Sequence, residues 1–208
     1  MVKLTGPMFS VTASGKFAKC IVFSIWKGIA YARMLVTPAN PQTDSQMSFR
    51  NMMTFLSQVW ASLTAGNKAT WEDPAETNGY SPFNAFCSGN MTRWDLYEAP
   101  GKEFPIEDTG AGGDAPTTTP TAGVKQIGLS IAHGVASPAW GWLIHRSTTT
   151  GFTPGRGTLI HAMETAADPD LWVDAPLETG TPYYYRIQGM SEDGVSGSLE
   201  AQVTATPT

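Results

Sequence analysis

The spacing of apolar residues changes along the chain, from alternation to a helical period and back. In residues 17–36, apolar and β-branched residues alternate on either side of Trp26-Lys27-Gly28. Gly28 can take the positive φ of a tight turn, so the segment predicts a β-hairpin. The residues expected to share a face are Phe17, Ile21, Phe23 and Ile25 on the first strand, and Ile29, Tyr31 and Leu35 on the second.

A helical period follows the hairpin. Pro38 and Pro41 oppose a continued central strand, and Thr43 precedes Gln46 with the spacing of a capping box. We therefore expect a helix that begins after Thr43. Its apolar positions, spaced as one face of a helix, are Phe49, Met52, Met53, Leu56, Val59, Trp60 and Leu63.

Two shorter helices are predicted next. One has Thr64 as its N-cap and ends before Pro74, and the other begins at Ser81-Pro82. The hairpin and about three helices predict a small α+β domain over residues 1–106. Because an isolated hairpin is marginally stable, it must pack on these helices or on a neighbouring chain.

The remainder of the chain predicts an all-β domain. The stretch 107–123 contains no large apolar residue and is rich in Gly, Pro, Thr and Asp. We place a flexible Gly/Thr/Pro linker at 107–117. Several short β-prone runs follow, separated by turn residues, and they predict an antiparallel β-sandwich over residues 118–208.

A tyrosine cluster, TPYYYRIQGM at 181–190, lies in one of these runs. Strand alternation places Tyr183, Tyr185 and Ile187 on one face and Tyr184 and Arg186 on the other. Only Tyr184 and Arg186 are therefore candidates for an exposed contact with a partner.

The segment APLETGTPYYYRIQGMSEDGVSGS resembles the end of a fibronectin type III domain. The resemblance implies that Leu177 and Gly180 hold a turn and that Tyr183 is a tyrosine corner, whose hydroxyl bonds back to the upstream backbone. It also implies a non-enzymatic spacer or interaction module. The sequence departs from the family where Ile131 replaces the usual buried tryptophan, and Trp140, Trp142 and Trp172 are the candidates to fill that volume.

Composition excludes some function classes. The net charge is -5, and residues 1–105 carry nine Lys and Arg against seven Asp and Glu, whereas residues 106–208 carry four against eleven. Neither half has the dense basic face that binds nucleic acid. The sequence has no apolar run long enough to span a membrane, so we expect no membrane partner.

The sequence lacks the residue spacings of common catalytic and metal-binding motifs. His133, His145 and His161 lack the spacing of a zinc site. Asp168, Asp170 and Asp174 lack the calcium-loop pattern, and a turn held by Asp side chains is the preferred interpretation. We therefore expect a protein that is not an enzyme and binds no cofactor or metal.

A second resemblance lies in residues 27–73. It is to a small domain common in proteins of tailed bacteriophages and prophages, which implies a virion or virion-associated protein. Arg33, Asn40, Gln46 and Arg50 are our candidates for assembly or anchoring, by strand addition or side-chain contacts. Alternatively, they only tie the Pro-rich turn to the helix. The matching positions are Arg33, Pro38, Asn40, Pro41, Thr43, Gln46, Arg50, Trp60, Leu63, Thr64 and Trp71.

The functional hypothesis is a non-enzymatic virion structural protein, made in the host cytoplasm and located in the virion. We favour a capsid decoration or head-fibre protein whose first domain binds the major capsid protein and self-associates, while the sandwich projects and makes weak multivalent contacts with host polysaccharide. One alternative is a tail or tail-tip component. The other is a bacterial carbohydrate-binding or adhesion module that uses Trp140, Trp172 and Tyr184.

Overall fold

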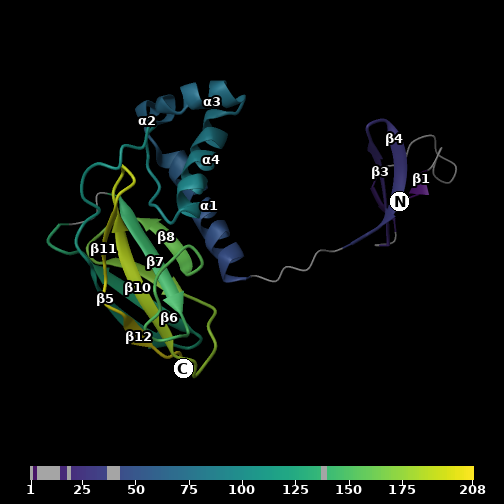
Figure 1. Ribbon diagram of the computed structural model, residues 1–208. Helices are drawn as coiled ribbons and strands as arrows, with labels where there is room; N and C mark the ends of the chain where they lie inside the picture. The colour runs from purple at the N-terminus through teal and green to yellow at the C-terminus, as the bar shows by residue number, and fades with distance from the viewer. Residues whose placement is uncertain (1, 4–14, 18–19, 37–42, 137–139) are drawn as a thin grey trace. The chain divides into compact units, whose positions relative to one another are not determined.

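The chain folds as two compact units, Met1–Pro41 and Gln42–Thr208. The computed structural model describes residues 2–3, 15–17, 20–36, 43–136 and 140–208 (Figure 1). The division lies between Pro41 and Gln42 and not at 107–117, where the sequence predicted the linker. The predicted 1–106 domain is therefore split between the two units.

The first unit contains a sheet with the strand order β1-β4-β3-β2. Its members are β1 (Val2–Lys3), β2 (Gly15–Phe17), β3 (Ile21–Trp26) and β4 (Ile29–Met34), all paired antiparallel. Lys27 and Gly28 have φ of 48° and 77°, so both turn residues are left-handed, as a two-residue hairpin requires. The predicted hairpin is confirmed.

Helices open the second unit: α1 (Asp44–Ser62), α2 (Ala65–Thr70), α3 (Glu72–Asn78) and α4 (Pro82–Asp95). The side chains of Thr64 and Ser81 cap α2 and α4, as predicted. Thr43 is extended but its side chain makes no capping hydrogen bond, so the expected capping box does not form. Helix α3 was not predicted, because Pro74 was expected to end a helix. Pro74 instead lies in the first turn of α3, where the backbone N–H has no partner within the helix and its absence costs little.

The following strands build the predicted antiparallel sandwich. One sheet has the order β5-β6-β9 and the other β11-β10-β7-β8, with β12 also paired to β10. The strands are β5 (Thr117–Gly123), β6 (Gln126–Ala132), β7 (Gly141–Ser147), β8 (Leu159–Glu164), β9 (Asp170–Asp174), β10 (Tyr183–Met190), β11 (Ser196–Leu199) and β12 (Val203–Ala205).

Trp142 fills the centre of the sandwich. It is fully buried in the cluster between the two sheets, together with Ile131. Its indole N–H donates to Oδ2 of Asp170 at 2.8 Å. Trp142 is therefore the tryptophan that occupies the volume left open by Ile131. Trp140 belongs to a different cluster, on the other face of the sheet.

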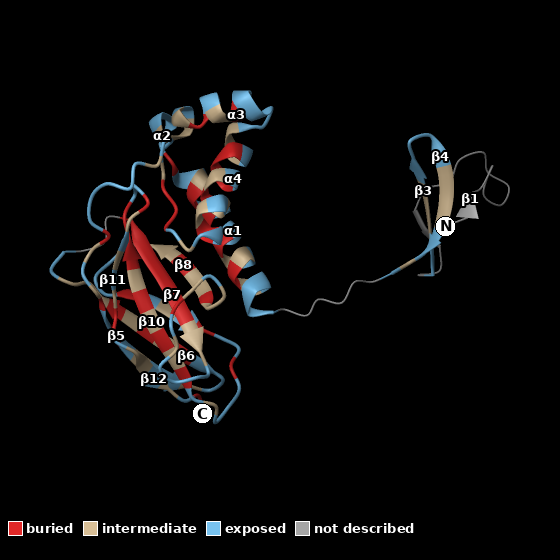
Figure 2. Ribbon diagram, in the orientation of Figure 1, coloured by how far each residue is buried: buried red, intermediate tan, exposed pale blue. Residues whose placement is uncertain are grey.

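That second cluster joins the helices to the sandwich. Apolar side chains of α1 and α4 pack with Leu143, Leu159 and Met190 from the outer face of the β7 sheet. The rings of Phe55 and Trp140 lie 5.2 Å apart between centroids. Figure 2 shows β7 buried along most of its length, with helices on one side and the second sheet on the other. The helices thus form a third layer instead of an independent domain.

The segment expected to be a flexible linker is packed against β11 and the preceding turn. The amide of Asp108 donates to the carbonyl of Asp193 at 3.0 Å, and Arg93 forms an ion pair with the Asp108 side chain. A Cβ added at Gly112 would lie 2.1 Å from the backbone nitrogen of Gly197. The prediction of a flexible linker is wrong, because main-chain contacts with residues 193–198 hold the segment in place. Such contacts cannot be predicted from amino-acid composition.

Candidate functional site

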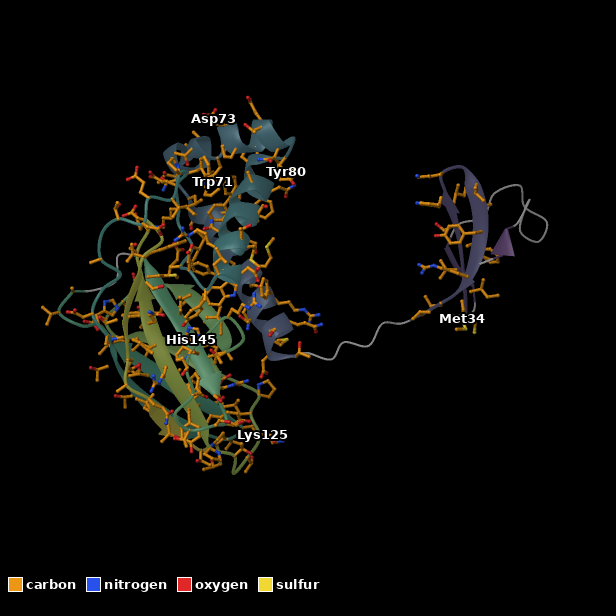
Figure 3. All side chains as sticks on the ribbon, in the orientation of Figure 1. Met34, Trp71, Asp73, Tyr80, Lys125 and His145 are labelled. Carbon is orange, nitrogen blue, oxygen red and sulfur yellow. The ribbon has the colours of Figure 1, made fainter. Side chains whose placement is uncertain are left out.

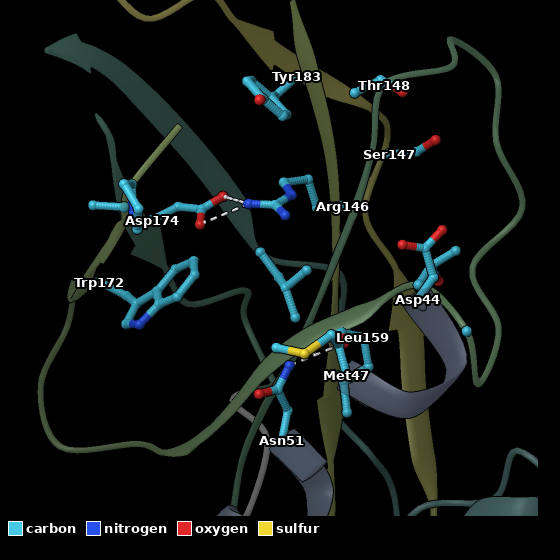
Figure 4. A pocket seen from close by; sticks show the side chains of 15 residues that line it. Asp44, Met47, Asn51, Arg146, Ser147, Thr148, Leu159, Trp172, Asp174 and Tyr183 are labelled. Carbon is cyan, nitrogen blue, oxygen red and sulfur yellow. Dashed lines mark hydrogen bonds and ion pairs between the residues drawn. The ribbon is translucent and has the colours of Figure 1, made fainter. Parts of the chain in front are cut away.

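A pocket of about 560 Å³ lies where α1 meets an edge of the sandwich (Figure 4). Its walls come from the first turns of α1, the end of β7, the start of β8, and β9 with the residues that follow it. We call it the Arg146–Trp172 pocket. All of its lining residues belong to the Gln42–Thr208 unit.

An ion pair between the half-buried Arg146 and the buried Asp174 forms the polar wall of this pocket. Nη1 of Arg146 lies 2.9 and 2.7 Å from the two carboxylate oxygens of Asp174, which is only 6% exposed. The hydroxyl of Tyr185 donates to the same carboxylate at 2.8 Å. The guanidinium also lies over the ring of Tyr183, 5.3 Å from its centroid. These contacts fix the orientation of Arg146 and neutralise its charge.

An aromatic wall stands beside the ion pair. The ring of Trp172 stacks on His161, with centroids 4.8 Å apart and an interplanar angle of 9°. Alternation along β9 turns Trp172 inward with Asp174, whereas Leu171 and Val173 face solvent. Burial lowers the pKa of His161, while the nearby Asp174 carboxylate raises it and only partly offsets that effect. The stacking partner of Trp172 is therefore neutral at pH 7.

Helix α1 supplies the remaining side of the pocket through Asp44, Met47 and Asn51. Figure 4 shows these residues on the helical side of the view, with Trp172 and Asp174 on the other. The Nδ2 of Asn51 donates to the carbonyl of Leu159 at 3.4 Å, so helix and strand are tied at the pocket wall. Together these walls can bind a small ligand through one aromatic face and several polar groups.

The hydroxyl that donates to Asp174 is not an activated nucleophile. Burial, followed by the charge and hydrogen bond of Asp174, raises the pKa of Tyr185 far above its ordinary value, so its hydroxyl stays protonated. Within the described residues, no group of three or more His, Cys, Asp or Glu could hold a metal ion. Those residues also include no helix that is both long and apolar enough to cross a membrane.

The predicted assembly residues fall in different units. Arg33 is exposed on β4, opposite Val22 of β3. Gln46 and Arg50 lie one turn apart on the exposed side of α1, where Nη1 of Arg50 is 3.9 Å from Sδ of Met47. Asn40 lies outside the described residues. Only Gln46 and Arg50 are thus brought together within one unit.

The residues assigned to the tyrosine corner lie together at one end of the sandwich. The amide of Glu178 donates to the hydroxyl of Tyr183 at 3.2 Å, which is the geometry of that motif. Leu177 is buried between the sheets, and Gly180 has φ of 78°. Tyr184 and Arg186 are partly exposed on the other face of β10.

The strands β3 and β4, which we call the hairpin sheet, expose large apolar side chains. By register, Ile21 and Met34 are neighbours on one face, and Trp26 and Ile29 on the other. Met34 is 73% exposed and Trp26 is 63% exposed. Figure 3 labels Met34 on this sheet. Within the described part of the chain, both faces of this sheet are therefore open. The alternating pattern of 17–36 predicted the strands but not which face would be covered.

Comparisons with known proteins found similarity only among solved structures. A scan against protein-family models found no match, and a search of curated proteins found none. Among solved structures, the chain is similar to a Fn3-like protein from Clostridium thermocellum, with 21% identity, a TM-score of 0.31, and coverage of 46% of this chain and 96% of that one. It is also similar to the FN1–FN3 domains of chicken CNTN1, with 12% identity, a TM-score of 0.37, and coverage of 46% and 32%.

A β-1,2-glucanase from Parabacteroides distasonis is similar over the same share of this chain, with 18% identity and a TM-score of 0.39, but the match spans only 13% of the glucanase. In this chain the sheet β5-β6-β9 faces the sheet β11-β10-β7-β8.

Proposed function

We propose that this protein is a non-enzymatic structural protein that attaches to a larger particle through its hairpin sheet. The main support is the apolar surface of this sheet. The exposed fractions of Ile25, Trp26 and Ile29 are 50%, 63% and 47%, and these residues lie on both faces of the sheet. Apolar surface of this kind is stabilised when a partner covers it. A unit of about 40 residues also buries too little surface to be stable by itself.

Charge indicates the chemistry of the partner. Residues 1–41 contain five Lys and Arg and no Asp or Glu, which leaves eight Lys and Arg and all eighteen acidic residues for the rest of the chain. An acidic partner surface would attract the hairpin unit, and the acidic remainder of the chain would be repelled from it. This asymmetry orients the molecule, with the fibronectin-like unit directed away from the particle.

The edges of the hairpin sheet offer a second mode of contact. Within the described residues, β1 pairs only with Tyr31 and Ala32 of β4, so the two ends of β4 have no strand beside them on that edge. Backbone groups at such an edge can pair with a strand of another chain. Arg33 lies on this strand and would contact the partner directly.

The particle that we propose is the virion of a tailed bacteriophage, and the partner is the major capsid protein or a second copy of this chain. The resemblance of residues 27–73 to a domain of phage proteins supports the virion. A small anchor with one outward unit suits a repeated capsid lattice, so we favour capsid decoration over a position in the tail. The anchor, however, is narrower than residues 1–106 and comprises residues 1–41.

Incorporation into particles tests this proposal. The full chain and its Ile25→Asp and Trp26→Asp variants would be supplied during phage growth, and their amounts in purified particles measured by mass spectrometry. We expect the wild-type chain to be incorporated and both variants to be lost. Leu171→Asp, at an even more exposed apolar position of the other unit, is the control and should be incorporated normally.

Electron microscopy of the same particles separates capsid from tail, because decorating density would cover the capsid surface. Absence of the wild-type chain from particles would contradict the proposal. Normal incorporation of both hairpin variants would contradict the assignment of the anchor.

A further inference from the structure

The Arg146–Trp172 pocket has the properties of a ligand site that the anchoring proposal does not use. Its volume of about 560 Å³ falls in the usual range for small-molecule sites, about 300–1,000 Å³. It combines a fixed aromatic ring, a buried carboxylate and a guanidinium in a small space. We propose that it binds a neutral sugar, with a pyranose ring against Trp172 and its hydroxyls on Asp174 and Arg146.

The Trp172 ring is held in place and lines the pocket, so it can stack against a flat ligand surface. Its indole is held by the stacked ring of His161, 4.8 Å away, and it still lines the pocket. An aromatic ring that is fixed before binding loses little conformational entropy when a ligand arrives. The C–H groups of a pyranose are apolar and form a face that can cover such a ring.

The hydrogen-bonding groups beside Trp172 fit hydroxyls. Among the described residues, Asp174 is the only hydrogen-bond partner of the Arg146 guanidinium, and it contacts Nη1 alone. The Nε and Nη2 groups of Arg146 can therefore donate to a ligand. The carboxylate of Asp174 is a strong acceptor. A sugar hydroxyl is both donor and acceptor, so adjacent hydroxyls can pair with both residues at once.

The charge of the pocket favours a neutral ligand. Its charged lining residues are Asp44, Arg146 and Asp174. Arg146 and Asp174 neutralise one another, and Asp44 is exposed to water. An anion would find no unpaired cation here, and a cation would find only the solvated Asp44 carboxylate. A neutral polyhydroxylated molecule requires no charge compensation.

The test uses the full chain and methyl glycosides of glucose, galactose, mannose and N-acetylglucosamine. Saturation-transfer NMR and calorimetry would measure binding, and we expect at least one glycoside to bind with a dissociation constant of about 1 mM or lower. An immobilised neutral polysaccharide forms a second arm. Binding in both arms identifies a residue of a polymer as the ligand, and binding of glycosides alone identifies a free sugar.

Variants at one position separate stacking from packing. Trp172→Phe keeps an aromatic face and should retain binding, whereas Trp172→Leu keeps apolar bulk and should weaken it about tenfold. Leu171→Ala, at the exposed neighbouring position of β9, should bind as the wild type does. Met47→Trp fills the pocket from α1 and should abolish binding even if the Trp172 variants fail to fold.

Failure of every glycoside to bind would overturn the sugar assignment. Binding of acetate or phosphate in their place would do the same, and so would full affinity in the Met47→Trp variant. None of these results depends on whether the hairpin sheet anchors the chain to a particle.

Discussion

His145 and Arg186 lie opposite each other on β7 and β10, and each has a buried nitrogen without a partner among the described residues. The hydroxyl of Thr158 donates to the carbonyl of Gly155 at 2.9 Å, so it must accept from Nδ1–H of His145. Nε2 of His145 is then a bare acceptor, while Nε of Arg186 is a donor.

Acid should destabilise the fold through His145. Burial lowers its pKa from 6.5 to about 3, so below pH 6.5 the unfolded chain takes up a proton that the folded chain does not. This contribution to stability is complete above pH 6.5 and is lost as the pH falls toward 3. We expect the free energy of unfolding to drop by about 2 kcal/mol between neutral pH and about pH 5.

Urea unfolding at several pH values measures this effect. In His145→Asn, whose amide can still donate to Thr158 but does not titrate, that part of the pH dependence should disappear. An unchanged pH profile in the variant would show that His145 is not the responsible group.

Replacing Arg186 and Arg146 by Met should have opposite consequences. Arg186→Met removes an unsatisfied buried donor, so we expect the stability to stay within about 0.5 kcal/mol or to rise. Arg146→Met leaves the buried Asp174 carboxylate without its cation and should cost about 3 kcal/mol. Thermal and urea unfolding of the two variants, measured side by side, check this contrast. Equal losses in both would refute it.

Cutting the chain at two places should distinguish the observed division from the predicted one. The fragment 42–208 keeps the cluster that joins helices and sandwich and should unfold in one cooperative transition. The fragment 118–208 exposes Trp140, Leu143 and Met190, which the helices normally cover. We expect it to aggregate or to bind hydrophobic dyes. A stable, monomeric 118–208 fragment would restore the two-domain view.

Gly112 tests whether residues 107–117 are packed. Gly112→Ala would force a methyl group against the backbone of Gly197, so we expect a loss of about 1–3 kcal/mol. Gly155→Ala is the matched control, because no atom lies within 4 Å of its added Cβ. Equal stabilities in the two variants, measured by urea unfolding, would mean that the segment moves aside freely.

Local patterns in the sequence determined most of the secondary structure. The left-handed turn at Gly28, the caps at Thr64 and Ser81, and the alternation from Tyr183 to Ile187 depend on residues close to one another in the chain. Steric limits and backbone hydrogen bonds act over such distances, so each pattern predicts its own element.

The tertiary structure alone decided what each apolar face contacts. The helical period of the sequence identified an apolar side on α1. It did not indicate that Phe55 on this side would pack against Trp140 of the sandwich. One signal was available, because the run of β7 from Trp142 to Ile144 does not alternate, as expected of a strand covered on both faces. The pocket had no comparable signal. Trp172, Arg146 and Met47 are far apart in sequence, and only the packing of α1 on the sandwich brings them together.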